Sequence, residues 1–267
     1  MPTVTSKDGT KIDFDKAGSG PAVILVTGAL SYRAFNPTLQ EVAELLAKDF
    51  TVYKYDRRGR GESGDIQPFA KERELEDLQA LIEDAGGSAM VFGFSSGAVL
   101  SLDATAVTPG ITKLGVYEPP LIVDNSRPPA PADYAEYITT LVAKGKRDQA
   151  VEYFLTQVVG IPSQIIGGIR QDEAAWSGMT AVAHTIPYDA AVVGNVMQGK
   201  PLPTHRWSKV TVPVLVADGG ASEPWMHHAA DALVNVLSHA SRQTLEGQTH
   251  AAAPKVLAPV IIEFFQH

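Results

Sequence analysis

The sequence lacks cysteine, long apolar runs and basic clusters, and each absence narrows the class of protein. Without cysteine there is no disulfide, no thiolate metal ligand and no cysteine nucleophile. No apolar run reaches the roughly 18–20 residues needed to span a bilayer. The polar N-terminus does not read as a signal peptide. The chain has 22 Lys and Arg and 30 Asp and Glu, which gives a net charge of −8. Nucleic acid and anionic membranes are therefore poor partner candidates. We therefore expect a soluble, cytoplasmic protein that binds neither nucleic acid nor membranes.

Short β-branched runs alternate with helical patterns over most of the chain. A run such as AVILV (22–26), with no polar face, is typical of a strand covered on both sides. Strands that alternate with helices predict an α/β fold with a mainly parallel, doubly wound sheet. An N-terminal hairpin is expected around Asp8-Gly9. The expected strands are 3–7, 10–16, 22–26, 51–55, 89–94, 113–117, 212–218 and a last one near 241–245.

The alternation stops between the strands expected at 113–117 and 212–218. Residues 121–208 begin with a proline-rich linker and continue with helical patterns at 133–144, 146–158, 163–176 and near 188–198. We interpret 121–208 as a helical cap inserted into a core domain made of residues 1–120 and 209–267.

The strongest chemical motif is Gly93-Phe94-Ser95-Ser96-Gly97, which fits the G-x-S-x-G nucleophile elbow with Ser95 at its centre. A predicted strand leads directly into Ser95 and helical spacing follows it, which is the context that the motif requires. The two glycines leave room for a strained turn that exposes the serine hydroxyl. Ser96 lies at the helix start, where its backbone N–H would face a developing oxyanion. The alternative is a small serine that only closes a tight turn.

A serine hydroxyl needs a general base, and histidine is the usual one because its ordinary pKa is near 6.5. Of the seven histidines, His250 is best placed. It follows the last predicted strand and precedes the closing helix, so we expect it at the same edge of the sheet as Ser95. His227 and His228 lie in a helix with polar spacing, and we expect them at the surface.

A series of motifs in this order resembles the α/β-hydrolase superfamily, especially its small, capped, esterase-type members. The resemblance covers nearly the whole chain and implies an eight-stranded sheet, nucleophile Ser95, base His250 and no cofactor. It also implies oxyanion donors from the backbone of Ser96 and of Ala29 or Leu30. The motifs are TGA (27–29), DRRGRGESG (56–64), GFSSG (93–97), VYEPP (116–120), VPVLVADGG (212–220) and GQTH (247–250).

The acid behind the histidine is not fixed by the motifs. Members of the family usually place an aspartate where this chain has Ser222, and a neutral hydroxyl cannot stabilise an imidazolium. We favour Glu118, which ends the strand after the nucleophile helix and begins a carboxylate-proline turn like that of some lipases and dehalogenases. Asp218 is the alternative acid, and Glu223 or no acid at all also stay open.

Apolar and aromatic side chains from the cap and the core are candidates for a substrate pocket. No HExxH motif or His/carboxylate cluster predicts a metal site. The substrate-binding candidates are Phe94, Trp176, Met179, Tyr188 and Trp225.

Together these features predict a serine hydrolase that cleaves a carboxylic ester or lactone of a small to medium, largely apolar substrate. The same constellation would also serve a C–C hydrolase, a thioesterase or a lyase. A hypothesis from another class is a ligand-binding protein with little turnover, which the absence of an acid at position 222 allows.

Overall fold

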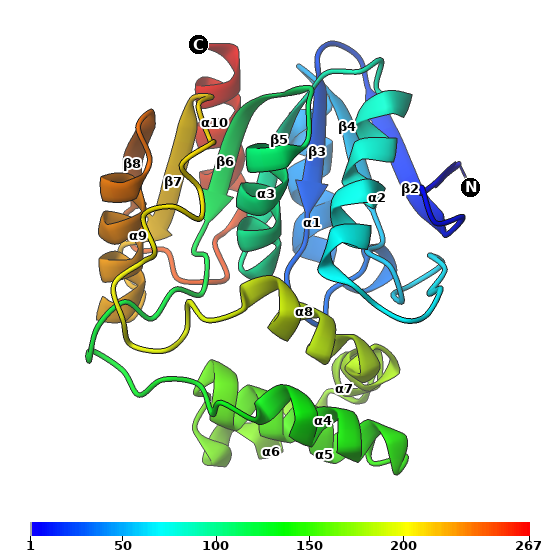
Figure 1. Ribbon diagram of the computed structural model, residues 1–267, viewed down its shortest axis with the longest axis vertical. Helices are drawn as coiled ribbons and strands as arrows, with labels where there is room; N and C mark the ends of the chain where they lie inside the picture. The colour runs from blue at the N-terminus through cyan, green and yellow to red at the C-terminus, as the bar shows by residue number, and fades with distance from the viewer. Residues whose placement is uncertain (1) are drawn as a thin grey trace.

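An eight-stranded sheet organises the chain, and the computed structural model describes residues 2–267 (Figure 1). The strand order is β1-β2-β4-β3-β5-β6-β7-β8. Strand β2 runs antiparallel to β1 and β4, and all other neighbours are parallel. The strands are β1 (Thr3–Thr5), β2 (Lys11–Gly18), β3 (Ala22–Val26), β4 (Thr51–Tyr55), β5 (Ala89–Phe94), β6 (Ile111–Tyr117), β7 (Val214–Gly219) and β8 (Ala240–Leu245).

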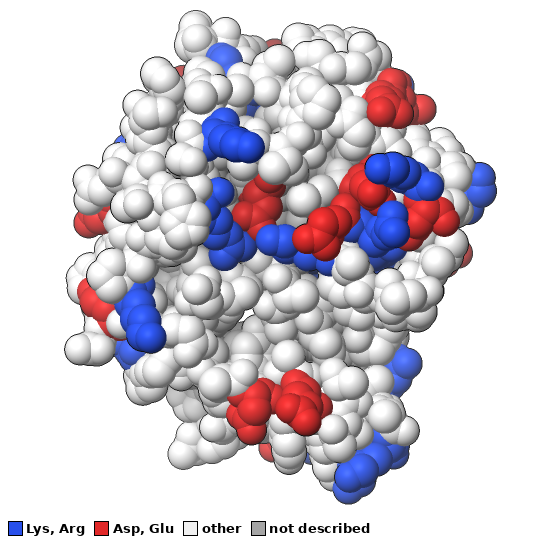
Figure 2. All heavy atoms as spheres, in the orientation of Figure 1, with Lys and Arg blue, Asp and Glu red and all other residues white. Residues whose placement is uncertain are grey.

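The central strands are apolar because both faces of the sheet are covered. Helices α1 and α10 pack against each other on one face, where Leu39 and Ile261 join its buried core. Helices α2, α3 and α9 cover the other face (Figure 1). On the side of the molecule seen in Figure 2, Lys and Arg side chains lie among Asp and Glu side chains. The mostly parallel α/β fold predicted from the sequence is confirmed. The helices outside the β6–β7 connection are α1 (Pro37–Leu46), α2 (Lys71–Asp84), α3 (Ser96–Val107), α9 (Pro224–Val236) and α10 (Pro254–Gln266).

The chain between β6 and β7 forms a layer of helices beyond the carboxyl ends of the parallel strands (Figure 1). We call α4–α8 with their short turns the helical insertion. One long helix expected at 163–176 is two, because the Asp172 side chain accepts the Ala175 N–H and starts a second helix. The last helix ends earlier than expected, at Gly194 with φ 64°. The elements are α4 (Tyr134–Ala143), α5 (Arg147–Tyr153), a π-helical turn (Phe154–Val159), α6 (Ser163–Gln171), α7 (Glu173–Ala181) and α8 (Ile186–Val193).

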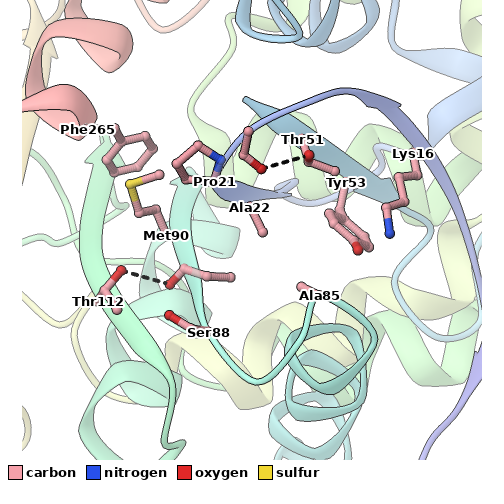
Figure 3. A pocket seen from close by; sticks show the side chains of 12 residues that line it. Lys16, Pro21, Ala22, Thr51, Tyr53, Ala85, Ser88, Met90, Thr112 and Phe265 are labelled. Carbon is pink, nitrogen blue, oxygen red and sulfur yellow. Dashed lines mark hydrogen bonds between the residues drawn. The ribbon is translucent and has the colours of Figure 1, made fainter. Parts of the chain in front are cut away.

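Two cavities lie at opposite ends of the sheet. The one at the amino ends has a volume of about 500 Å³ and is lined by the first residues of four parallel strands, with Lys16 and Tyr53 at one side (Figure 3). Among the described residues that line it, only these two have titratable side chains, and the Lys16 amine lies 4.8 Å from the Tyr53 ring centre. The other cavity, at the carboxyl ends, has a volume of about 780 Å³ and contains Ser95. Any reaction that uses Ser95 would therefore take place in the cavity at the carboxyl ends of the strands.

Candidate active site

Ser95 lies in a strained turn between β5 and α3. Its φ of 53° and ψ of −125° are a conformation that residues with a side chain rarely adopt. Gly97 makes the turn possible, because a Cβ atom there would lie 2.4 Å from the Thr27 carbonyl oxygen. Gly93 is equally confined, since its Cβ would lie 2.6 Å from the Cα of Ala98. Strand, turn and helix thus have the arrangement that the motif predicts, with a half-buried serine at the centre.

Backbone donors gather around Ser95. Ser96 is the first residue of α3, so its N–H has no partner within the helix. The loop after β3 carries Ala29 and Leu30 to the same cavity, and Gly28 touches the nucleophile turn, since a Cβ on it would lie 2.8 Å from the Ser95 Cβ. Leu30 has φ 59°. The expected oxyanion donors and Ser95 therefore line one cavity.

The structure places His250 against Glu118. His250 Nδ1 lies 2.7 Å from Glu118 Oε2. Because an ionised carboxylate only accepts hydrogen bonds, Nδ1 carries the proton and Nε2 is left to accept one. The loop that holds His250 is fixed by Tyr117, whose hydroxyl donates to the Thr249 carbonyl at 2.6 Å. Both His250 and Glu118 line the cavity that contains Ser95.

Glu118 is a fully buried carboxylate without an arginine or lysine partner within residues 2–267. Burial raises its pKa, but hydrogen bonds from His250, Ser222 and the Gly219 N–H outweigh burial and leave the pKa below its ordinary value of 4.5. The Ser222 hydroxyl donates to Oε1 at 2.5 Å and the Gly219 N–H at 2.8 Å. Ser222, at the position where the family usually has its acid, therefore supports Glu118 instead.

The other two acid candidates lie elsewhere. Asp218 binds His227 and Arg242, not His250. His227, expected as a surface residue, is held by that contact and its side chain is 28% exposed. Glu223 lines the cavity but is exposed and forms no ion pair with His250. Among the three carboxylates, Glu118 alone contacts His250, the histidine that lines the same cavity as Ser95.

Three residues other than glycine have a positive φ within residues 2–267, and all three belong to this site. They are Leu30 at 59°, Ser95 at 53° and Glu118 at 45°. Such conformations persist only where the surrounding structure enforces them, and they concentrate at functional sites. Backbone strain therefore marks the same place as the sequence motifs.

The cavity around Ser95 is largely apolar. Of the five substrate-binding candidates, Phe94, Met179 and Trp225 line it. Trp176 does not, and its ring N–H donates to the exposed side chain of Asp148 at 2.7 Å. Tyr188 does not either, because it stacks on Phe69 at 4.0 Å and its hydroxyl is bound to Asp65. These two expectations are corrected: both aromatic side chains hold parts of the protein together outside the cavity.

A buried ion-pair cluster joins the insertion to the loops around Ser95. Asp189 of α8 accepts Arg57 Nη1 at 2.7 Å and Arg60 Nη2 at 2.6 Å. The Ser96 hydroxyl also donates to Asp189, at 2.7 Å. Arg60 in turn donates to the Gly28 carbonyl at 2.6 Å. Burial raises the pKa of Asp189, but the two guanidinium groups and Ser96 lower it below its ordinary value. Asp189, which the sequence did not single out, thus joins α8 to the turn at Ser95 and to the loop after β3.

Within residues 2–267, no three His, Asp or Glu side chains lie close enough together to hold a metal ion. None of the helices in the same range has the length and apolarity to cross a membrane.

Comparison with known proteins agrees with this architecture. The model of the alpha/beta hydrolase family matches residues 23–260, and the chain belongs to that family. One similar solved structure is an alpha/beta hydrolase from Sphaerobacter thermophilus DSM 20745. It is 52% identical, the alignment covers 99% of this chain and 100% of that one, and the TM-score is 0.91.

More distant relatives share the fold. The enol-lactonase from Burkholderia xenovorans LB400 is 16% identical with a TM-score of 0.73, and the alignment covers 100% of both chains. A thermophilic esterase from Thermogutta terrifontis is 20% identical with a TM-score of 0.71, and the alignment covers 99% of this chain and 97% of that one.

The uncharacterized hydrolase YraK of Bacillus subtilis (strain 168) is 36% identical over 99 residues. That match spans about a third of each protein, 36% of this chain and 35% of YraK.

Proposed function

We propose that this protein is a serine hydrolase that cleaves a carboxylic ester or lactone through the triad Ser95, His250 and Glu118. The observation that carries the proposal is the contact between His250 Nδ1 and the buried Glu118 carboxylate, inside the cavity that contains Ser95 in its strained turn. The family and the esterase and lactonase folds among its relatives support hydrolysis as the reaction class.

The proposed reaction has two steps. In the first, His250 Nε2 takes the Ser95 proton, the serine oxygen attacks the ester carbonyl, and His250 returns the proton to the leaving alcohol. In the second, a water gives a proton to His250 and attacks the acyl-enzyme carbonyl. The bond to the Ser95 oxygen then breaks, His250 returns the proton to that oxygen, and the acid product leaves. Glu118 stays ionised and stabilises the imidazolium in both steps.

The oxyanion that forms in each step is assigned to backbone N–H groups. Ser96 supplies one from the start of α3, where the helix dipole adds a partial positive charge. The loop at Ala29 and Leu30 supplies the other. The Asp189 cluster supports both donors, since it binds the Ser96 hydroxyl and, through Arg60, the Gly28 carbonyl.

The largely apolar cavity of about 780 Å³ fits a small to medium acyl or lactone substrate. A C–C hydrolase, a thioesterase or a lyase would use the same three residues, and turnover on a panel of acyl compounds separates them from an esterase. The contact of Glu118 with His250 favours turnover over mere ligand binding, because position 222 no longer has to supply the acid.

Covalent labelling tests the nucleophile. The wild-type protein is expected to react with a fluorophosphonate at Ser95, and Ser95→Ala to lose both the label and ester turnover. Ser31→Ala is the matched control, because Ser31 also lines the cavity but its hydroxyl contacts only Asn36 and has no role in the proposed reaction. Normal labelling of Ser95→Ala would overturn the proposed mechanism.

A further inference from the structure

The cavity around Ser95 contains one cationic side chain among the described residues that line it. Arg127, on the connection from β6 to α4, is the only lysine or arginine in a lining that is otherwise mostly apolar. A guanidinium in such a place has a cost, because charge is poorly solvated beside apolar groups. A positive charge at this position therefore needs an explanation.

Neighbouring groups hold Arg127 in place from two sides. Its Nη2 donates to the Val158 carbonyl at 3.0 Å and its Nη1 to the Val159 carbonyl at 3.2 Å. The guanidinium carbon lies 4.6 Å from the ring centre of Trp225. Val158, Val159 and Trp225 all line the same cavity. The guanidinium thus has a fixed place at the cavity wall.

No carboxylate neutralises this charge by direct contact. None of the ion pairs formed within residues 2–267 includes Arg127. A guanidinium has five N–H donors, and the two carbonyls occupy two of them. Burial lowers the pKa of Arg127, and the charge of Glu223 acts in the opposite direction from a distance without a hydrogen bond. Donors and charge therefore remain for a ligand.

We propose that Arg127 binds a carboxylate that the substrate carries in addition to its reacting carbonyl, so that the preferred substrate is an acidic ester or lactone. This inference rests on the proposed function and narrows its substrate class. Arginine suits the task because its planar fork matches a carboxylate and forms charge-assisted hydrogen bonds. The alternative is that Arg127 only fastens the connection after β6 to the insertion.

A pair of esters that differ in one group tests the proposal. The mono-4-nitrophenyl ester of adipic acid and 4-nitrophenyl hexanoate have acyl chains of the same length. The adipate ester ends in a carboxylate where the hexanoate ester ends in a methyl group. The wild type is expected to prefer the adipate ester in kcat/KM. Arg127→Gln is expected to reduce the adipate-to-hexanoate ratio about 10- to 100-fold, the range for a lost charge-assisted hydrogen bond. A general loss of stability cancels in this ratio.

Two variants serve as references. Arg147→Gln is the matched control, since Arg147 also donates to two insertion carbonyls, those of Thr180 and Ala181, but does not line the cavity. It is expected to leave the ratio unchanged. Glu223→Gln removes the carboxylate that competes for Arg127 and is expected to raise the ratio about 2- to 5-fold.

Binding separates this proposal from the proposed function. Calorimetry with the Ser95→Ala variant compares the dissociation constants of the two esters without turnover, with and without Arg127→Gln. A weaker binding of the adipate ester alone on Arg127→Gln supports the subsite, even if the wild type hydrolyses neither ester and the proposed function fails. Equal effects on both esters overturn the subsite and leave the esterase proposal standing.

Discussion

Two neighbouring strands end in a buried carboxylate that touches a histidine, and the two pairs differ in every other partner. Glu118 follows β6 and contacts His250 at 2.7 Å. Asp218, within β7, contacts His227 at 2.5 Å. Both carboxylate side chains are buried, with 0% and 1% exposed, and burial, which raises the pKa of each, is outweighed by hydrogen bonds in both cases.

The charge balance separates the two pairs. Asp218 is bound by two nitrogens of Arg242 at 3.0 and 2.8 Å and by the Thr244 hydroxyl, so a permanent cation already compensates it. Glu118 accepts only neutral donors besides the histidine. An imidazolium that forms beside Glu118 therefore meets an uncompensated negative charge, and one beside Asp218 does not. Of the two histidines, only His250 lines the cavity that contains Ser95. The partners of the two carboxylates, more than their positions at the sheet edge, are therefore what favours Glu118 as the proposed acid.

Replacement of the two histidines sharpens this comparison most. His250→Gln is expected to lower kcat by about 10⁴- to 10⁶-fold, because Ser95 then has no base. His227→Gln, the matched control, is expected to change kcat less than about threefold, since His227 does not line the cavity. Steady-state kinetics on an activated ester measures both, and a large loss in His227→Gln would exchange the roles of the two pairs.

Replacement of the two carboxylates is expected to have the next largest effect. Glu118→Gln is expected to cost about 10³- to 10⁴-fold in kcat, the effect of removing the acid's charge in a related triad. Asp218→Asn leaves Arg242 without its buried partner, so we expect lower thermal stability but a much smaller loss of kcat. Kinetics and thermal unfolding of the same preparations give both quantities. The opposite ranking in kcat would make Asp218 the acid.

An acid placed in the loop after β7 would test whether the position of the carboxylate matters. Glu118 contacts both Ser222, at 2.5 Å, and His250, at 2.7 Å. A carboxylate at position 222 would therefore lie close enough to act on His250 in a variant whose residue 118 is uncharged. The double variant Glu118→Gln, Ser222→Asp is expected to regain about 10- to 100-fold of the activity that Glu118→Gln loses. Ser222→Asn in the same background is the uncharged control. Equal activity of the two double variants would mean that charge at 222 cannot replace Glu118.

The smallest effect is on stability at acid pH. The pKa of Glu118 lies below 4.5 in the folded protein, so its ionised form stabilises the fold above pH 4.5, and this contribution is lost as the pH falls through the folded pKa. The difference in free energy of unfolding between wild type and Glu118→Gln should therefore shrink below pH 4.5. Urea unfolding between about pH 7 and pH 3 measures it. A difference that stays constant over this range would contradict the lowered pKa.

Local patterns predicted the fold and the elements that carry the site. Strands such as AVILV show their burial in the residues themselves, and the G-x-S-x-G turn is a local feature around Ser95. The carboxyl ends of parallel strands meet at one edge, which is why His250 was expected beside Ser95. Strand order left Glu118 and Asp218 open, and the resemblance of the carboxylate-proline turn favoured Glu118. The catalytic roles of Glu118 and His250 stay predictions.

Contacts between distant segments were beyond the sequence. Ser96 and Asp189 are 93 positions apart, and nothing in either neighbourhood indicates the other. Trp176 and Tyr188 were placed in the cavity by residue type alone. Their actual orientation depends on how the inserted helices pack, which helical spacing does not specify. The pairing of His227 with Asp218 is another such contact.

The strained backbone at Leu30, Ser95 and Glu118 bears on protein engineering. A non-glycine residue in a sparsely populated conformation costs about 1–3 kcal/mol, and the net stability of a folded domain is only about 5–15 kcal/mol. A search for heat-resistant variants would therefore favour glycine at these three positions, since glycine adopts a positive φ freely. Such a screen would select against the proposed nucleophile Ser95 and the proposed acid Glu118. Stability and turnover therefore compete at these positions, and a library designed for stability should leave them unchanged.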